Sequence, residues 1–174
     1  MKNLLTLLLV LGTIPMHAQK IVSLQLGPIH SAMGNTHADL GKTIGYFVGI
    51  GLKEKITDVL SVDGSVSYQH QRHPFGDRSF AAHSINALFG VNLHTSENLY
   101  FIVGPEVGHS IAFRMDGELY RQNKDVRFAA VDGIGFRISD KATVFGRYHH
   151  AIDGQGSGFD YNVQVGVSLA ILRQ

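Results

Sequence analysis

The sequence predicts an all-β protein, specifically an eight-stranded antiparallel up-and-down transmembrane β-barrel. Apolar residues recur at every second position over eight segments, a period that only β-strands convert into two distinct faces. The connections between these segments alternate between short and long. After residue 18, no apolar run approaches the roughly 18 residues that a transmembrane helix needs. A chain of this kind would therefore cross a membrane as a closed barrel, because lipid leaves open sheet edges unsatisfied.

The first eighteen residues form a separate unit. Lys2 supplies a positive start, residues 4–11 form an apolar centre, and the small residue Ala18 ends the unit. The apolar centre is too short to span a bilayer as a helix, and this order of features is typical of a secretory signal peptide. We expect cleavage after Ala18, so that residues 1–18 are a signal peptide and residues 19–174 form a single outer-membrane β-barrel domain.

The eight segments follow one another along the rest of the chain. They are Ile21–Pro28, Thr43–Leu52, Val59–Gln71, Ala81–His94, Leu99–Arg114, Val126–Ser139, Ala142–His150 and Phe159–Leu172. In the second, every even position from Ile44 to Leu52 is apolar, and the odd positions between them are glycines and Phe47. The third, fourth and fifth alternate in the same way, which predicts a strand with two unlike faces in each case.

Two of the later segments need separate comment. In the sixth, Asp132 falls on the face of Phe128 and Ile134, and we interpret this as a β-bulge that shifts the register. In the last, every odd position from Phe159 to Ile171 is aromatic or aliphatic. That run is longer than the five or six residues common in soluble strands and covers the roughly nine to eleven of a tilted transmembrane strand.

The connections predict how the barrel is oriented. Three are tight and polar: 52–59, 94–99 and 139–142. The other four are longer: 28–42, 72–80, 115–125 and 151–158. In a meander, all short turns then lie at one end and all long loops at the other, as in outer-membrane barrels with periplasmic turns and longer extracellular loops.

The composition of the polar face indicates which face looks inward. A soluble barrel of the lipocalin kind would show a water-exposed face rich in Lys, Glu and Thr. Here that face is mostly Gly, Ser and Asn with scattered charges, as suits a narrow lumen. The apolar face would then contact lipid, with interface aromatics at Tyr46, Tyr68, Phe101, Tyr148 and Tyr161.

The scattered charges predict an ion-pair network inside the barrel. An eight-stranded barrel has room only for side chains, so buried charges must find partners. We expect Asp63 and Glu106 to be satisfied by Arg147, Arg137 or Arg114. The alternative is that some of these five residues lie near the rim and are solvated.

The overall charge argues against nucleic acid as a partner. Lys+Arg number 15 and Asp+Glu 14, without the basic stripe of a nucleic-acid binder.

Eight histidines map to the long-loop half: His30, His37, His70, His73, His83, His109, His149 and His150. Imidazoles could capture a metal or haem, but no tight ligand spacing recurs. We therefore expect polar rim histidines and no cofactor.

An enzymatic alternative is a lipid A-modifying hydrolase. Lipid A deacylases carry a His-x-Ser pair with a downstream carboxylate, which forms a serine hydrolase triad. Here His149 and His150 precede Asp153, Ser157 and Asp160, but no serine stands two positions after either histidine. We assign no catalytic residue.

The chain resembles the small outer-membrane β-barrel proteins common in Bacteroidetes, similar in architecture to the barrel domain of outer-membrane protein A. The resemblance rests on the export signal before Gln19 and on three stretches: GIGLKEKITDVLSVDGSVSY from Gly49, YFIVGPEVGHS from Tyr100 and GIGFRISDKATVFGRYHHAI from Gly133. It implies a location in the outer membrane and insertion by the barrel insertion machinery. Such barrels usually end in an aromatic residue, whereas this chain ends Ile171-Leu172-Arg173-Gln174.

The sequence therefore predicts a non-enzymatic integral outer-membrane barrel with a filled lumen and a structural or loop-mediated binding role. The expected partners are outer-membrane lipid and lipopolysaccharide, with an unidentified partner at the extracellular loops. We expect a monomer. A soluble, lipocalin-like periplasmic binder remains the other alternative.

Overall fold

The computed structural model describes residues 19–32, 43–75, 78–116, 118–121, 126–152 and 161–174. Within these ranges the secondary structure is entirely β. The strands are β1 (Lys20–Ala32), β2 (Thr43–Lys55), β3 (Leu60–Phe75), β4 (Arg78–His94), β5 (Leu99–Met115), β6 (Glu118–Arg121), β7 (Val126–Ser139), β8 (Ala142–Ala151) and β9 (Tyr161–Arg173). No helix in the described ranges is long and apolar enough to cross a membrane.

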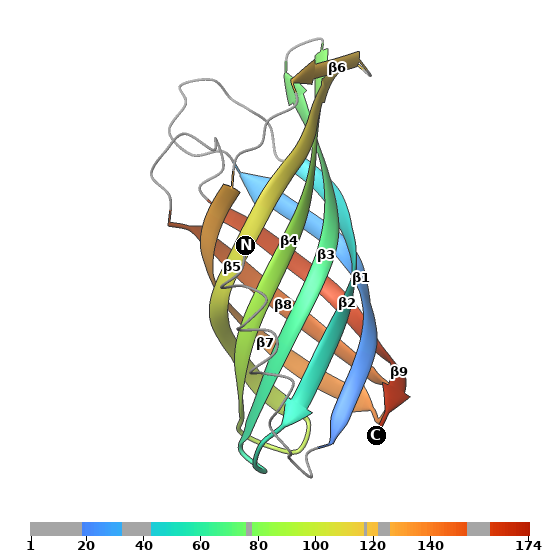
Figure 1. Ribbon diagram of the computed structural model, residues 1–174, viewed down its shortest axis with the longest axis vertical. Helices are drawn as coiled ribbons and strands as arrows, with labels where there is room; N and C mark the ends of the chain where they lie inside the picture. Colours follow the sequence, from blue (N-terminus) through green and yellow to red (C-terminus); the bar gives the residue numbers. More distant parts are fainter. Residues whose placement is uncertain (1–18, 33–42, 76–77, 117, 122–125, 153–160) are drawn as a thin grey trace, which may run out of the picture.

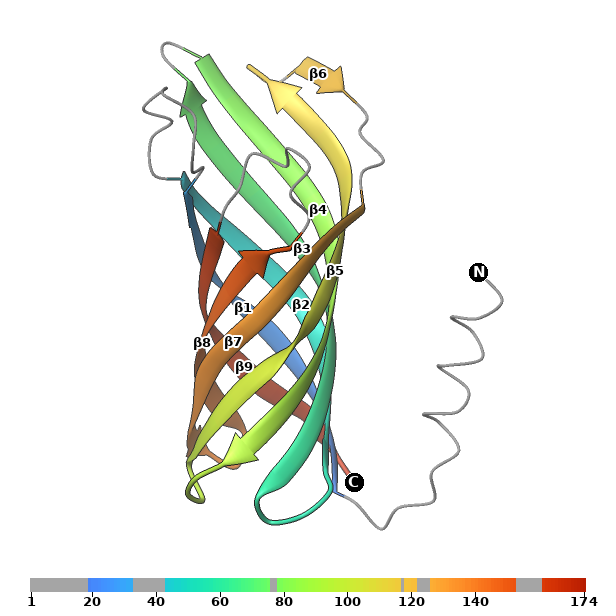
Figure 2. The same cartoon turned by 90° about the vertical axis from the view of Figure 1, so that its left-hand side faces the viewer.

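Eight of the strands close into an antiparallel barrel, as predicted (Figures 1 and 2). Neighbouring barrel strands pair in chain order, and β1 pairs with β9 to close the ring. Leu24 of β1 lies opposite both Ile50 of β2 and Leu169 of β9. The short β6 pairs only with the end of β5 and is not one of the eight barrel strands. Sequence alternation did not reveal β6, because four residues are too few to establish a period.

The two ends of the barrel differ. The backbone of Lys20 exchanges hydrogen bonds with that of Gln174, so the two described termini meet at one end. The short connections at 56–59, 95–98 and 140–141 lie at this same end (Figure 1). We call it the turn end, and the opposite end the loop end.

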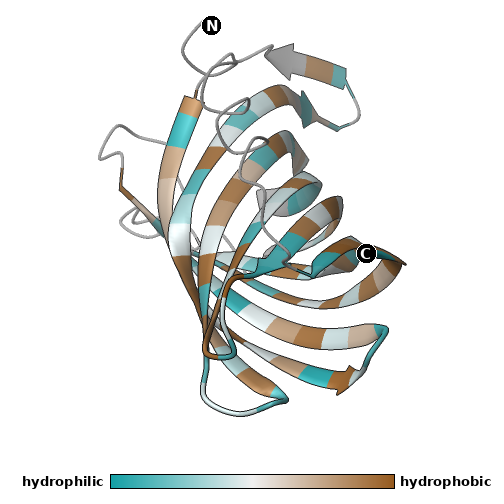
Figure 3. Ribbon diagram, turned by 60° about the horizontal axis from the view of Figure 1, so that its bottom comes forward, coloured by the Kyte–Doolittle hydropathy of each residue, from teal (hydrophilic) through white to brown (hydrophobic). Residues whose placement is uncertain are grey.

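The outer face of the barrel is apolar. The even positions of β2 from Ile44 to Leu52 are 42–74% exposed, whereas Phe47 between them is only 2% exposed. Figure 3 shows this alternation as brown and teal bands along the strands. A lipocalin has the inverse arrangement, with apolar residues inside. An apolar outer face on a closed barrel is what contact with lipid requires, and it argues against the soluble alternative.

Three aromatic side chains are buried together inside the barrel. Phe47, Tyr100 and Phe145 form a buried cluster with Ile29 and Ile102. The rings of Phe47 and Phe145 lie 5.9 Å apart between centroids. We call these three aromatic residues the lumen plug.

A glycine makes room for two rings of the plug. A Cβ on Gly166 would lie 2.5 Å from the tip of the Phe47 ring and 2.7 Å from that of Phe145. Such approaches are far inside van der Waals contact. Gly166 is therefore needed because two rings occupy the space of its missing side chain.

One side of the barrel wall rises well above the other. Strands β3, β4 and β5 have 16, 17 and 17 residues, whereas β8 has 10. At about 3.3 Å of rise per residue, the difference is on the order of 20 Å along the strand. The extra length projects at the loop end, where β6 joins it (Figure 2). We call residues 71–75, 78–83, 111–116 and 118–121 the raised wall.

The structure corrects the register expected around Asp132. Strands β5 and β7 pair without interruption from Leu99 opposite Phe136 to His109 opposite Val126. Asp132 therefore lies on the outer face with its apolar neighbours, and no bulge moves it inward. The irregularity of β7 lies instead against β8, between Arg137 and Ser139. The prediction was wrong because it assumed that a charged residue must face the lumen.

Candidate functional site

A buried ion pair joins opposite sides of the lumen. Nη2 of Arg147 on β8 lies 3.9 Å from Oδ2 of Asp63 on β3. Nη1 of the same guanidinium donates a hydrogen bond of 3.2 Å to Oε1 of Gln25 on β1. The guanidinium carbon also stacks 4.2 Å from the centre of the Phe145 ring. Arg147 therefore connects three strands that are distant in sequence and stands beside the lumen plug.

The other carboxylate predicted for the lumen has a different partner. Oε1 of Glu106 lies 3.1 Å from Nδ1 of His149, and both side chains are buried. We expected an arginine in this place. The sequence predicts His149 only as one of several rim histidines, because its contact with Glu106 depends on how β5 and β8 face each other across the lumen. Asp63 and Glu106 thus have different nearest partners, while Arg147 also interacts electrostatically with Glu106.

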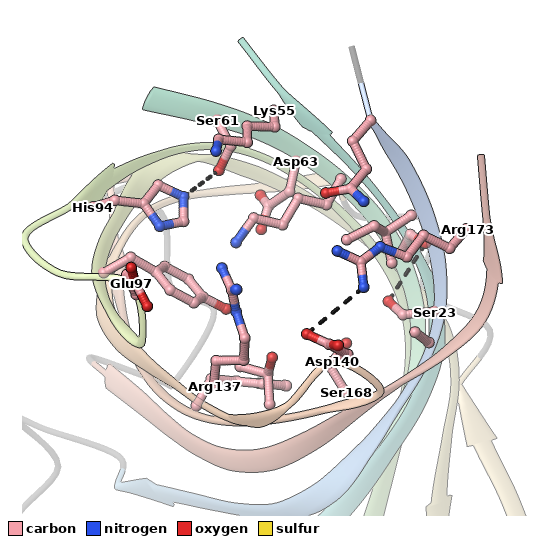
Figure 4. Close-up of a pocket in the computed structure, with 18 of the residues that line it drawn as sticks. Ser23, Lys55, Ser61, Asp63, His94, Glu97, Arg137, Asp140, Ser168 and Arg173 are labelled. Atoms are coloured by element: carbon pink, nitrogen blue, oxygen red, sulfur yellow. Dashed lines mark hydrogen bonds and ion pairs between the residues drawn. The ribbon is translucent and has the colours of Figure 1, made fainter. Parts of the chain in front are cut away.

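The remaining two arginines of the predicted network lie apart from these pairs. The Arg137 side chain reaches into a cavity near the turn end (Figure 4). Arg114 lies on the outer face of the barrel. There, Ala112 of β5 pairs with His83 while Ser110 pairs with Ser84, so β5 contains one extra residue at this point. A bulge of this kind reverses the side-chain alternation beyond it and turns Arg114 outward.

Amide side chains occupy the upper lumen. Oγ of Ser31 donates to Oε1 of Gln71 at 3.0 Å, and Nε2 of Gln71 donates to Oε1 of Gln69 at 3.5 Å. Nδ2 of Asn162 also donates to Oε1 of Gln69, at 3.5 Å. With the lumen plug below them, these amides form a packed interior, as expected for an eight-stranded barrel.

A cavity of about 610 Å³ opens at the turn end. Tyr100, Phe145 and Arg147, all buried, are among the residues that line it. Figure 4 shows Arg137 and Asp63 directed into the opening and Arg173 paired with Asp140 at its edge. The cavity is thus lined by charged side chains and borders on the lumen plug.

An exposed turn lies at the mouth of this cavity. Nζ of Lys55 donates a hydrogen bond of 2.6 Å to Oδ1 of Asp58. This bond, and the positive charge of Lys55, hold the pKa of the Asp58 carboxyl below its ordinary value of 3.8. Asp58 therefore stays ionised at any pH near neutrality.

Histidine and tyrosine rings form a ladder on the outer face, toward the loop end. The ring centroids of Tyr46 and His70 are 5.1 Å apart, those of His70 and His83 are 4.7 Å apart, and those of His83 and Tyr68 are 6.0 Å apart. The Tyr68 hydroxyl also lies 2.6 Å from Nδ1 of His83. We call these four residues the ring ladder.

The ring ladder was only partly predictable. Tyr46 and Tyr68 were expected as interface aromatics and His70 and His83 as rim histidines. Their association depends on the register of two hairpins, which pairs Tyr46 with His70 and His70 with His83. Of the other expected interface aromatics, Phe101 is exposed on the outer face, and the side chain of Tyr161 lies outside the described residues.

The adjacent histidines considered for catalysis point to opposite faces. His149 faces the lumen and contacts Glu106. His150 faces outward, where its Nε2 lies 2.6 Å from Oδ1 of Asp132 and its ring is 4.3 Å from that of Tyr148. Asp153, Ser157 and Asp160 lie outside the described residues, as does His37. In the described ranges, no three or more His, Cys, Asp or Glu residues cluster as a metal site would require.

Comparison with solved structures shows the same fold in two bacterial surface proteins. Ail, the attachment invasion locus protein of Yersinia pestis, has 14% identity and a TM-score of 0.54, covering 89% of this chain and 99% of its own. Neisserial surface protein A has 12% identity and a TM-score of 0.60, covering 86% of this chain and 96% of its own. At such identities the likeness concerns the fold alone. No curated protein sequence matches the chain.

A family model supplies the assignment that the fold cannot. The model for the outer membrane protein beta-barrel domain matches residues 4–170, nearly the whole sequence. This match agrees with the closed barrel, its apolar outer face and its packed lumen. The chain therefore belongs to the outer membrane protein beta-barrel domain family and is a protein of the outer membrane.

Proposed function

We propose that the protein is a non-enzymatic outer-membrane barrel that works through its cell-surface face rather than through its lumen. The observation that carries this proposal is the contrast between a plugged interior and a raised wall. Phe47, Tyr100 and Phe145 are buried together inside the barrel, where we propose that they obstruct the path of a solute. A barrel that cannot conduct can still anchor and orient a surface for binding.

The raised wall has the internal bonds that a binding surface needs. The Ser79 backbone amide donates to Oδ1 of Asp116 at 2.9 Å, and the Asp116 amide donates to the Ser79 carbonyl at 2.9 Å. Nη2 of Arg72 donates to the Ser79 hydroxyl at 3.1 Å. The wall is thus tied across β3, β4 and β5. It supports a loop-mediated role with a partner at the extracellular end.

Lipopolysaccharide is the membrane partner that the outer face favours. Arg72 and Arg114 are exposed on the outer face next to the ring ladder, and Arg114 is close enough to His83 to interact with it electrostatically. Tyrosine rings beside cations suit the level where acyl chains meet charged head groups. Arginine binds phosphate through a planar fork of donors. We propose that Arg72 and Arg114, beside the ring ladder, contact the phosphates of lipid A.

The test compares thermal unfolding in phospholipid vesicles with and without lipopolysaccharide. Lipopolysaccharide should raise the unfolding temperature of the wild type, because a ligand of the folded state stabilises it. In the double variant Arg72→Gln and Arg114→Gln, most of that gain should be lost. The control Lys141→Gln removes a cation from the turn end and should keep the gain. Equal gains in all three proteins would refute the lipopolysaccharide contact.

The hydrolase alternative depends on one observation, the pairing of His150 with Asp132 on the outer face. A histidine and a carboxylate are two of the three members of a serine hydrolase triad. Incubation of the purified barrel with lipopolysaccharide should nevertheless release no fatty acid. Release that disappears in His150→Ala would replace our proposal with the enzymatic one.

Three finer expectations accompany the proposal. We expect cleavage of the signal peptide after Ala18, insertion by the barrel insertion machinery, and a monomer in the membrane. The kinship with Bacteroidetes barrels and with the barrel of outer-membrane protein A likewise stays a prediction. Mass spectrometry of the mature protein, with Gln19 expected as its first residue, tests the cleavage site.

A further inference from the structure

The cavity at the turn end carries a surplus of positive charge. Six cationic side chains line it: Lys53, Lys55, Arg137, Lys141, Arg147 and Arg173. Four carboxylates oppose them: Asp58, Asp63, Glu97 and Asp140. At the mouth, Lys55 pairs with Asp58 at 2.6 Å and Arg173 with Asp140 at 3.7 Å. The excess of cations therefore lies further inside.

Two of the inner cations form no ion pair within 4.0 Å among the described residues, although Asp63 is close enough to Lys53 to attract it electrostatically. The Lys53 ammonium lies 3.7 Å from the centre of the Tyr100 ring and forms no ion pair within 4.0 Å in the described chain. The Arg137 side chain likewise has no hydrogen bond or ion pair to any described residue. Cations held away from bulk water are costly unless they find a partner. Both therefore offer binding capacity to an anion.

The neighbouring ion pair leaves further polar atoms unsatisfied. Arg147 Nε and Asp63 Oδ1 are buried and have no hydrogen-bond partner within the described residues. Arg147 is 5% exposed and also lines the cavity. One of the Arg147 donors is thus unused, in the same cavity as two cations that form no ion pair within 4.0 Å in the described residues. Buried donors in folded proteins are normally satisfied, so an unused donor beside a cavity marks a place for an acceptor.

The positions of these groups are fixed by the barrel. Lys53 and Asp63 are paired residues of β2 and β3, Arg137 lies on β7, and Arg147 lies on β8. The Tyr100 ring holds Lys53 in place through a cation–π contact. Cations from three separate strands thus converge on one space. The volume of about 610 Å³ is within the usual range of small-molecule sites, about 300–1,000 Å³.

We propose that this cavity is a binding site for a small organic dianion that enters from the turn end, the periplasmic side of an outer-membrane barrel. The ligand class is a molecule with two carboxylate groups, or with one phosphate group. Two negative charges would neutralise the excess of six cations over four carboxylates. The Arg137 guanidinium can bind a carboxylate or phosphate through two parallel hydrogen bonds, and Lys53 adds a point charge. The lumen plug closes the inner end, so the ligand binds without passing through.

Titration of the refolded, full barrel in detergent micelles tests the site. Succinate and inorganic phosphate are the two probes, added at constant ionic strength, with neutral succinamide as the comparison compound. Amide and arginine Nε–H signals are followed by NMR. We expect saturable shifts of residues that line the cavity, with one ligand per barrel, for at least one of the two anions. The anion that produces saturable shifts identifies the acid group that the site binds.

Variants separate a specific site from a general positive field. Lys53→Met and Arg137→Gln should each weaken binding by about tenfold or more, because each removes a charged contact. Lys53→Arg should keep most of the affinity. Lys20→Gln removes a cation at the same end from a residue that does not line the cavity, and should leave binding unchanged.

Three results would overturn the proposal. They are an absence of saturable shifts with both anions, equal binding of succinamide, and a loss in Lys20→Gln as large as that in Lys53→Met. Heat-modifiable migration on a gel verifies that each variant is folded before titration. If Lys53→Met does not fold, Arg137→Gln alone decides between a specific site and a general field. These outcomes are independent of the proposed cell-surface role, which concerns the other end of the barrel.

Discussion

Arg147 and Asp63 lie 3.9 Å apart across the lumen, on strands β8 and β3, which are not neighbours in the barrel. Backbone hydrogen bonds between strands fix the relative positions of neighbouring strands only. A side-chain pair across the lumen therefore adds a constraint on the cross-section that backbone pairing does not provide. Both side chains are at most 10% exposed, so water screens the pair poorly.

Removal of one member of this pair should be more harmful than removal of both. We expect Arg147→Met to lower the free energy of unfolding by about 3 kcal/mol, because it leaves the Asp63 carboxylate buried without its partner. The double variant Arg147→Met and Asp63→Asn should recover part of this loss. Urea unfolding in lipid vesicles measures both. Additive losses would show that the two side chains do not interact.

A second prediction concerns the glycine beneath the lumen plug. Gly166→Ala should lower the free energy of unfolding by about 1–3 kcal/mol, because the added methyl group overlaps the Phe47 and Phe145 rings. Adding Phe145→Leu to this variant should restore part of the stability. Gly146→Ala is the matched control, since a Cβ there meets no atom within 4 Å. Similar losses at both glycines would refute the steric explanation.

The plugged lumen also predicts the electrical behaviour of the protein. Wild-type barrels should show little or no conductance in planar bilayers, because Phe47, Tyr100 and Phe145 close the section above the cavity. The double variant Phe47→Ala and Phe145→Ala should conduct more than the wild type. Large, stable wild-type currents would contradict the proposed role of the plug.

The exposed turn at the mouth of the cavity predicts a titration result. The hydrogen bond from Lys55 and its charge lower the pKa of Asp58, so Lys55→Met should raise that pKa towards 3.8. A carboxyl with a lowered pKa in the folded state stabilises the fold above its unfolded pKa, and this contribution disappears as the pH falls through the folded pKa. Carboxyl carbon shifts followed by NMR between pH 2 and 6 measure the change. An unchanged pKa in Lys55→Met would refute the assignment.

Sequence alternation predicted the strands well because their two faces meet very different surroundings. The bounds of β7 match those of its predicted segment. Strands β2 and β4 are each only three residues longer than the segments predicted for them. Period two places Ile44 and Ile50 on one face, and the composition of the other face predicts that this one points outward, as the structure shows. Where one face contacts lipid and the other a narrow lumen, a shift of one residue would reverse every side chain. Register is therefore strongly specified along each strand.

The side-chain partners were harder to predict, because they depend on what lies across the barrel. The bulge in β5 places Arg114 outside, and nothing in the local sequence marks it. His149 rather than an arginine meets Glu106, a contact between residues 43 positions apart in the chain. Pairing within a hairpin can be inferred from turns. Contacts across a lumen depend on the tilt and stagger of all eight strands together.

The unequal height of the barrel wall gives the molecule a front and a back. A cylinder of even height would present the same profile to every neighbour in the plane of the membrane. Here β3, β4 and β5 stand tall on one side, while the opposite rim ends early with β8. Among the described residues, a molecule that approaches the loop end thus meets long strands on one side of the barrel and a short strand on the other. Rotation of the barrel about its own axis becomes a variable in any encounter.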